Sequence, residues 1–126
     1  MAYPGSSKKV SFNKSVAFAL AGIKASFGER NMRIHISLGL LVIMAGVFFS
    51  ISRMEWLFIL LCIAGMFTLE MLNTAIEKTV DLVTDEFHPL AKVAKDLAAG
   101  AVLVYTVYSI IVGIIIFLPK VIHFFT

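Results

Sequence analysis

Residues 56–83 read WLFILLCIAGMFTLEMLNTAIEKTVDLV, and this stretch decides the fold. It is apolar almost without interruption as far as Leu69, and ionisable side chains begin at Glu70. The stretch is longer than the about 20 residues that a helix needs to cross a hydrocarbon core of about 30 Å. We therefore expect a membrane helix whose last third reaches water or a polar cavity.

Two further apolar stretches have the length of a membrane span. They cover 34–52 and 97–118, and we expect Pro119 to end the second because proline lacks the N–H that a helix interior uses. The composition agrees with this prediction. Hydrophobic residues make up 60% of the chain and the mean hydropathy is +0.93, whereas soluble domains are typically about 45–50% apolar.

The segment before the first span is amphipathic. Its apolar residues recur at helical spacing on one face, and Lys14 and Lys24 can reach lipid phosphates, which is typical of a helix lying on a membrane surface. The sequence thus predicts an all-α integral membrane protein. Its parts are a flexible tail over 1–10 and a single membrane domain over 11–126, with a surface helix at 11–29 and transmembrane helices at 34–52, 56–83 and 97–118.

The eleven Lys and Arg residues are unevenly divided between the two sides of such a three-span protein. Only Arg53 and Lys120 fall on one side, and the others share the side of the N-terminus. The positive-inside rule therefore predicts a cytoplasmic N-terminus. The net charge of +3 then reflects an anionic bilayer surface, not a nucleic acid partner.

Several common chemistries lack their sequence signature. Cys62 is the single cysteine, so the chain has neither an intramolecular disulfide nor a multi-cysteine metal site. The sequence contains no GxxxxGK[ST] loop and no protein-kinase motif set. Any nucleotide site would therefore be of a non-standard kind.

Acidic and amide side chains form a stripe along the last part of the second span. At about 100° per residue, Glu70, Asn73, Thr74, Glu77 and Asp81 fall on one side of a helix. Placing Glu70 in the membrane costs on the order of 2.5–3.5 kcal/mol unless it finds partners or water. The stripe could simply bury hydrogen bonds between helices, but several acids on one stripe favour a functional site.

The depth of each acid suggests its chemistry. Glu77 is near the interface, and Glu29 ends the surface helix at the same level, so both are candidate ligands for Mg²⁺, which prefers oxygen donors. Glu29 could instead be a surface acid beside Arg30. Glu70 lies deeper, where a poorly solvated carboxylate could deprotonate a lipid hydroxyl, and it is the candidate general base.

Basic and polar residues near the third span could bind phosphates. Lys95 can offer an ammonium group, with Asp96 orienting it or capping the helix, although Lys95 could also be only a membrane anchor. His88 could contact a nucleotide or simply be solvated. Asn73 could donate to Glu70, to Glu77 or to a phosphate. The small residues around Gly100 are explained first by close helix packing and second by a lipid groove.

Three motifs carry a resemblance to a known family. They are EMLNTAIE at 70–77, TVDLVTDEFHPLAK at 79–92 and AKDLAAGAVL at 94–103. Together they resemble the prokaryotic diacylglycerol kinase family, which transfers phosphate from Mg-ATP to lipid alcohols in bacterial cell membranes. The segment ERNMRIH at 29–35 looks most like the Gram-positive undecaprenol kinases. The resemblance covers nearly the whole chain beyond the tail.

The resemblance implies a homotrimer with active sites shared between subunits, ATP as co-substrate and Mg²⁺ as cofactor. It implies that Glu70 is the general base and that Glu29 and Glu77 hold the metal. The surface helix matches less well before Glu29, and only Lys14 and Phe18 are nucleotide candidates there. The remaining expected contacts are Glu29, Glu77, Glu86, Phe87, His88, Lys95 and Asp96 for ATP, Asn73 and Asp81 as further active-site polar groups, and Glu70 and Ala99 for the lipid.

Two other classes of protein would also explain an intramembrane glutamate. A small ion-coupled transporter could use Glu70 as a relay, but it would not explain the cluster of Glu29, Glu77, Lys95 and Asp96. A structural subunit of a larger complex could use the stripe for assembly alone. Within the kinase interpretation, undecaprenol is the expected acceptor and diacylglycerol the alternative, because an apolar groove discriminates lipid tails weakly.

Overall fold

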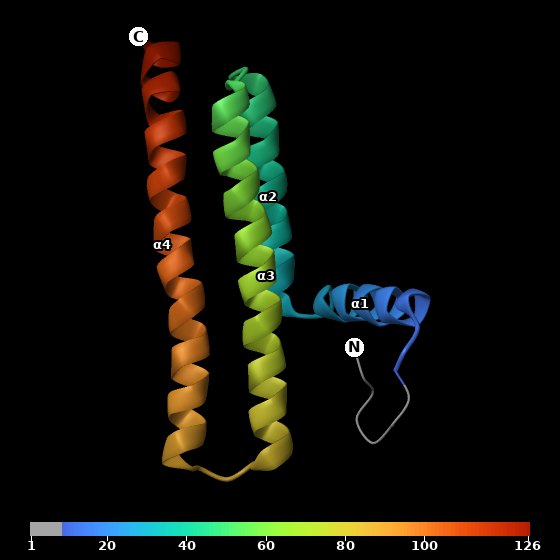
Figure 1. Cartoon of the computed structure of the whole chain (residues 1–126). Helices are drawn as coiled ribbons and strands as arrows, with labels where there is room; N and C mark the ends of the chain where they lie inside the picture. Colours follow the sequence, from blue (N-terminus) through green and yellow to red (C-terminus); the bar gives the residue numbers. More distant parts are fainter. Residues whose placement is uncertain (1–8) are drawn as a thin grey trace.

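The computed structural model describes residues 9–126, and most of the expected tail at 1–10 lies outside them. The described chain contains four α-helices (Figure 1). Three of these helices are long and apolar enough to cross a membrane. The helices are α1 at Phe12–Ser26, α2 at Arg30–Phe48, α3 at Arg53–Val83 and α4 at Pro89–Phe125.

Helices α2 and α4 both pack against α3, and α1 projects sideways from the start of α2 (Figure 1). At 1.5 Å per residue, the 19 residues of α2 span about 28 Å, which matches a hydrocarbon core. The 31 residues of α3 and the 37 of α4 are longer, and both continue past the start of α2 (Figure 1). The predicted all-α fold with three candidate membrane spans is therefore confirmed.

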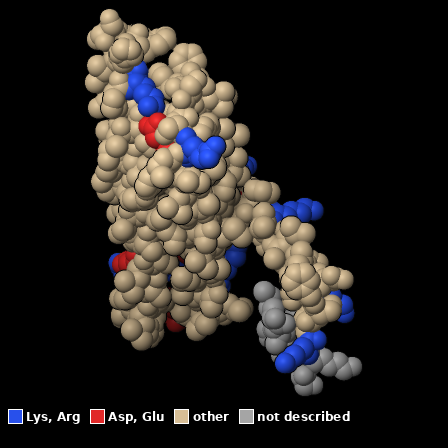
Figure 2. All heavy atoms as spheres, turned by 45° about the horizontal axis from the view of Figure 1, so that its top comes forward, with Lys and Arg blue, Asp and Glu red and all other residues tan. Residues whose placement is uncertain are grey.

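Charged side chains on the face shown in Figure 2 lie at the ends of the bundle and on α1, and an uncharged belt separates them. Large apolar side chains of the belt remain exposed, among them Leu103, Val104 and Ile115 of α4. In water such a surface would be unfavourable, whereas lipid tails solvate it at no cost.

The packed core is small and lies near the turn between α2 and α3. Ile51, Ile59 and Ile116 form its buried cluster, and Trp56 packs against them. Gly46 makes this packing possible, because a Cβ there would lie 2.7 Å from the Trp56 ring. The start of α3 is fixed by a capping box in which the Ser52 hydroxyl and the Glu55 carboxylate each accept a backbone N–H. This end of the bundle is thus anchored by packing and by a cap.

Helix α4 differs from the predicted span at 97–118 at both ends. It begins at Pro89, because proline suits the first turn of a helix and the Nδ1 of His88 accepts the N–H of Leu90 at 3.1 Å. The first two turns carry the lysines that hydropathy alone placed outside the span. The α4 helix therefore begins well before its apolar part.

The prediction that Pro119 ends the last helix is wrong, because α4 continues to Phe125. Proline removes one backbone hydrogen bond, and contacts of the residues that follow it compensate. Lys120 forms an ion pair with Glu55 at 3.2 Å, and the ring of Phe124 contacts Phe48 and Phe49. These contacts hold the last turn of α4 against the ends of α2 and α3.

The predicted helix at 11–29 is shorter in the structure, at Phe12–Ser26, and Ser11 caps its start because the Ser11 hydroxyl accepts the Lys14 N–H at 3.4 Å. The predicted span at 34–52 is instead the helix Arg30–Phe48, and the predicted 56–83 begins earlier, at Arg53. Most of α1 is exposed, including Phe12 and Leu20. Placement of α1 on a membrane surface stays a prediction.

Candidate active site

Glu70 lies on α3 at the depth of the second turn of α2. It is almost fully buried, with 3% of its surface exposed. Its Oε2 atom lies 3.5 Å from Nε2 of His35, which projects from α2. Within residues 9–126 no other ion pair reaches the Glu70 carboxylate. The imidazole of His35 is therefore the one ion-pair partner of this buried carboxyl group among the described residues.

Asn73 and Glu77 form the next step along the same face of α3. The Asn73 side-chain amide donates to Oε1 of Glu77 at 3.2 Å. Asn73 is buried, and its Oδ1 has no hydrogen-bond partner among the described residues. The sequence left open whether Asn73 donates to Glu70 or to Glu77, and the structure places the bond on Glu77. The acceptor oxygen of Asn73 remains available to a donor.

Glu29 reaches α3 from the connection between α1 and α2. Its Oε1 lies 3.3 Å from Nζ of Lys78, the residue after Glu77. The side chain of Glu29 is 39% exposed, and that of Lys78 is 70% exposed, so solvent screens this pair and it is weak. The ion pair nevertheless brings the carboxylate of Glu29 to the part of α3 that carries Glu77.

These two carboxylates fit the donor set of Mg²⁺. That ion is usually held by one or two carboxylates, with waters and substrate phosphates completing its shell. Within residues 9–126 no cluster of three or more His, Cys, Asp and Glu side chains could by itself hold a metal. Glu29 and Glu77 are solvent-accessible oxygen donors, as a shared metal–nucleotide site requires. The protein would therefore supply part of the coordination shell and the nucleotide the rest.

Lys95 and Asp96 are both near the start of α4, but they do not pair with each other. Lys95 Nζ lies 2.6 Å from Asp81 Oδ1 on α3, and Asp96 pairs with Lys92 one turn earlier on α4. The prediction that Asp96 orients Lys95 or caps the helix is therefore wrong. Asp81 holds the ammonium group of Lys95, and His88 caps α4.

A hollow of about 400 Å³ lies at this end of the bundle, between the last turn of α3 and the first turns of α4. It gathers five of the residues that were expected to bind ATP, and both lysines that pair with acids here also line it. The hollow therefore presents acidic, basic and aromatic groups in one place. The expected residues that line it are Glu86, Phe87, His88, Lys95 and Asp96, together with Asp81.

Some predicted site residues lie apart from this hollow. Lys14 and Phe18 are on α1 and are not among the residues that line it. Ala99 is exposed on α4, and a Cβ added at Gly100 beside it would meet no atom within 4 Å, whereas Ala98 is buried. Close packing within this chain therefore accounts for Ala98 but not for Gly100, and a lipid groove beside Ala99 stays a prediction.

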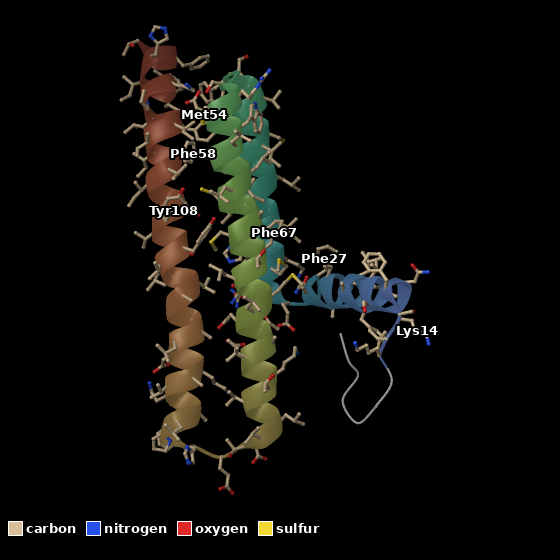
Figure 3. All side chains as sticks on the ribbon, viewed as in Figure 1. Lys14, Phe27, Met54, Phe58, Phe67 and Tyr108 are labelled. Atoms are coloured by element: carbon tan, nitrogen blue, oxygen red, sulfur yellow. The ribbon has the colours of Figure 1, made fainter. Side chains whose placement is uncertain are left out.

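Two residues that contact the predicted carboxylates, His35 and Lys78, were not among the site residues predicted from the sequence. His35 carried a usable signal, because an ionisable residue inside an apolar span is rarely without a function. Lys78 carried none, since a lysine near the end of a span is explained by the positive-inside rule alone. Figure 3 shows the side chains that project from α2, α3 and α4 in this part of the bundle.

The fold and the site together define a class: a small all-α protein with three candidate membrane spans and a row of carboxylates that begins within one of them. Comparison with known proteins assigns the family. The profile of the prokaryotic diacylglycerol kinase family matches residues 17–117, and the chain belongs to that family.

The names of the similar proteins give two different lipid substrates, undecaprenol and diacylglycerol. The chain is 53% identical to an undecaprenol kinase of Bacillus subtilis over 110 residues, covering 86% of this chain and 89% of the relative. It is 41% identical to a diacylglycerol kinase of Synechocystis over 83% of this chain and 61% of the relative. It is 39% identical to a diacylglycerol kinase of Pseudomonas aeruginosa over 69% of this chain and 72% of the relative.

Proposed function

We propose that this protein is a lipid kinase that transfers the γ-phosphoryl group of Mg-ATP to the hydroxyl of undecaprenol, giving undecaprenyl phosphate. The observation that carries the proposal is the buried Glu70 carboxylate, which lies on the candidate span α3, on the same face as Asn73 and Glu77. Similarity to an undecaprenol kinase over most of both chains supports undecaprenol as the acceptor.

The chemistry divides between the two ends of the acidic stripe. Glu70 takes the proton of the lipid hydroxyl while that oxygen forms a bond to the γ-phosphorus, and the bond from this phosphorus to the bridging oxygen of ADP breaks. Glu70 releases the proton to water before the next turnover. The products are a lipid phosphate monoester and ADP. The lipid alcohol can thus react through its hydroxyl at the interface while its hydrocarbon tail remains in the membrane.

The residues at the cytoplasmic end of α3 and α4 bind and align the nucleotide. Lys95 offers its ammonium group to the phosphates, and Asp81 keeps that group in place at 2.6 Å. Phe87 and His88 line the hollow where the base and ribose would lie. Glu86 and Asp96 are acceptors at its rim. Charge neutralisation and alignment are the main contributions that phosphoryl transfer requires of a protein.

Glu29 and Glu77 would hold the metal ion between the hollow and Glu70. Mg²⁺ bound there would neutralise charge on the transferred phosphoryl group. Lys78, at 3.3 Å from Glu29, adds a positive charge beside the same carboxylate. Asn73 orients Glu77, the residue at the metal end of the stripe, through its 3.2 Å hydrogen bond.

The active assembly is a homotrimer in the bacterial cell membrane, with the N-terminus and the active site facing the cytoplasm. Two observations support this proposal. Along α3, Glu70 and Asp81 are eleven residues or about 16 Å apart, so a neighbouring subunit could bring a second set of nucleotide groups closer to the base. Large apolar side chains on α4 are also exposed and could pack on another copy.

A competition assay tests the acceptor. Purified protein in detergent receives γ-labelled ATP, Mg²⁺ and equal amounts of undecaprenol and diacylglycerol, and the two lipid products are separated. We expect label mainly in undecaprenyl phosphate. Label mainly in phosphatidic acid would replace the proposal by the second candidate, which the similarity to diacylglycerol kinases favours. Label in neither lipid would refute the kinase proposal.

A further inference from the structure

Within residues 9–126, His35 forms the one ion pair with Glu70, at the deep end of the acidic stripe. Its side chain is 18% exposed, so it is mostly buried, and its Nε2 faces Oε2 of Glu70 at 3.5 Å. The neighbouring Asn73 amide donates to Glu77. The imidazole is therefore the group placed to orient the Glu70 carboxylate.

The ring of His35 also lines an apolar groove between the spans. The groove has a volume of about 320 Å³ and is bordered by residues of α2, α3 and α4, including Gly39, Met66 and Phe117. His35 thus lies where the groove meets the carboxylate of Glu70. A lipid alcohol whose hydroxyl reaches Glu70 would have its head group beside this ring.

We propose that His35 is a positioning residue for Glu70, an inference that rests on the proposed function. Its Nε2–H donates to Oε2 and fixes the plane of the carboxylate, which leaves Oε1 to take the proton of the lipid hydroxyl. The 3.5 Å separation is longer than the about 2.7–3.2 Å of a strong N–H···O bond. Catalytic hydrogen bonds commonly shorten when the substrate is bound.

A donor at this place has a clear physical role. A carboxylate without a donor at this place is free to rotate, so neither oxygen is held toward the lipid hydroxyl, and poor alignment lowers the rate of proton transfer. One imidazole N–H selects one rotamer. Because His35 touches Glu70 and not the nucleotide hollow, its loss should lower kcat with lipid and leave the KM for Mg-ATP unchanged.

Two substitutions separate positioning from packing. In His35→Leu the donor is lost and the bulk is kept, and we expect kcat to fall about tenfold or more, but by no more than the about 10²–10⁴-fold that a positioned base itself contributes. In His35→Gln an amide N–H can occupy the place of Nε2, and we expect much of kcat to return. His123→Leu is the matched control, since His123 is exposed at the far end of α4 and should keep wild-type kinetics.

The inference would be overturned if kcat fell equally in His35→Leu and His35→Gln. It would also be overturned if His35→Leu kept the wild-type kcat, or if this variant changed only the KM for Mg-ATP. A second measurement does not depend on turnover. We expect the ring ¹⁵N resonances of His35 in detergent to shift when Glu70 is changed to Gln, with the His35→Gln spectrum providing the assignment. Unchanged resonances would refute the contact, whereas failure of the wild-type protein to phosphorylate any lipid alcohol would refute the proposed function alone.

Discussion

Glu70 and Glu77 lie on the same face of α3 but in different surroundings. The first is 3% exposed and faces an imidazole, whereas the second is exposed and accepts from the Asn73 amide. Burial disfavours a charged carboxylate and so suits proton transfer, while exposure lets a carboxylate bind a hydrated cation. Two residues seven positions apart can thus serve proton transfer and metal binding because the helix carries them to different depths.

A metal requirement at Glu77 can be measured directly. We expect Glu77→Gln to raise the Mg²⁺ concentration that gives half-maximal activity by at least about tenfold, or 1.4 kcal/mol of binding free energy, because an amide is a weaker ligand than a carboxylate. The measurement is a Mg²⁺ titration of lipid phosphorylation at saturating ATP.

Glu55→Gln is the control for this titration. Glu55 lies on the same helix at the opposite end of the bundle, where it pairs with Lys120. We expect its Mg²⁺ dependence to match the wild type. A Glu77→Gln titration that overlays the wild-type curve would remove Glu77 from the metal site.

At the residue scale, the sequence predicted which side chains gather but not all of their partners. Helical periodicity places Glu70, Asn73 and Glu77 on one face of a helix, so this arrangement could be predicted from the sequence. The pairing of Lys95 with Asp81 could not, because it joins two helices whose relative rotation is set by packing. Periodicity orders residues within one helix and carries no information about the facing helix.

At the scale of single helices, the contact between α3 and α4 depends on one glycine. A Cβ at Gly65 would lie 2.1 Å from the Oη atom of Tyr105. That same hydroxyl donates to the backbone carbonyl of Leu61 at 2.6 Å. Because a carbonyl within a helix already accepts one bond, the tyrosine adds a second and fixes how closely the two helices approach.

Gly65→Ala should therefore destabilise the bundle. We expect a loss of about 1–3 kcal/mol, typical of overpacking, because the Tyr105 ring must move and its hydrogen bond to Leu61 must lengthen. Thermal unfolding in detergent measures the effect. Gly100→Ala is the control, since a Cβ at that position meets nothing within 4 Å. Equal melting temperatures for the two variants would contradict this description of the contact.

The existence of each helix could be predicted, but several ends could not. Hydropathy located all three spans because a membrane helix needs about 20 apolar residues. It could not show that α4 begins at Pro89, where polar residues form the first turns, or that it continues through Pro119. Those ends are decided by a histidine cap and by contacts of Lys120 and Phe124 with other helices.

For the whole molecule, charged side chains are gathered at the two ends of the bundle. An uncharged belt separates these ends on the face shown in Figure 2. The ion pair of Lys120 and Glu55 lies at the start of α3, opposite the acidic and basic residues at its other end. The hollow at that other end is lined by Lys92 and Lys95. A bilayer around the belt would therefore expose the hollow to the side that the positive-inside rule makes cytoplasmic.

Cysteine labelling tests this orientation. In a Cys62→Ala background, we expect Lys24→Cys to react with an impermeant thiol reagent only from the cytoplasmic side and Arg53→Cys only from the outer side. Lys24 lies on α1, and Arg53 begins α3 at the opposite end of α2. Intact cells and inverted vesicles give access to one side each. Labelling of both positions from the same side would contradict the three-span arrangement.

The most direct test of the proposed mechanism is the transfer of labelled γ-phosphate from Mg-ATP to undecaprenol by the wild-type protein and by Glu70→Gln. We predict labelled undecaprenyl phosphate with the wild type and a rate lower by about 10²–10⁴-fold with the variant, because a positioned base contributes that much. Nucleotide binding should be equal in the two proteins, since Glu70 lies outside the hollow. Wild-type turnover by Glu70→Gln would contradict the mechanism.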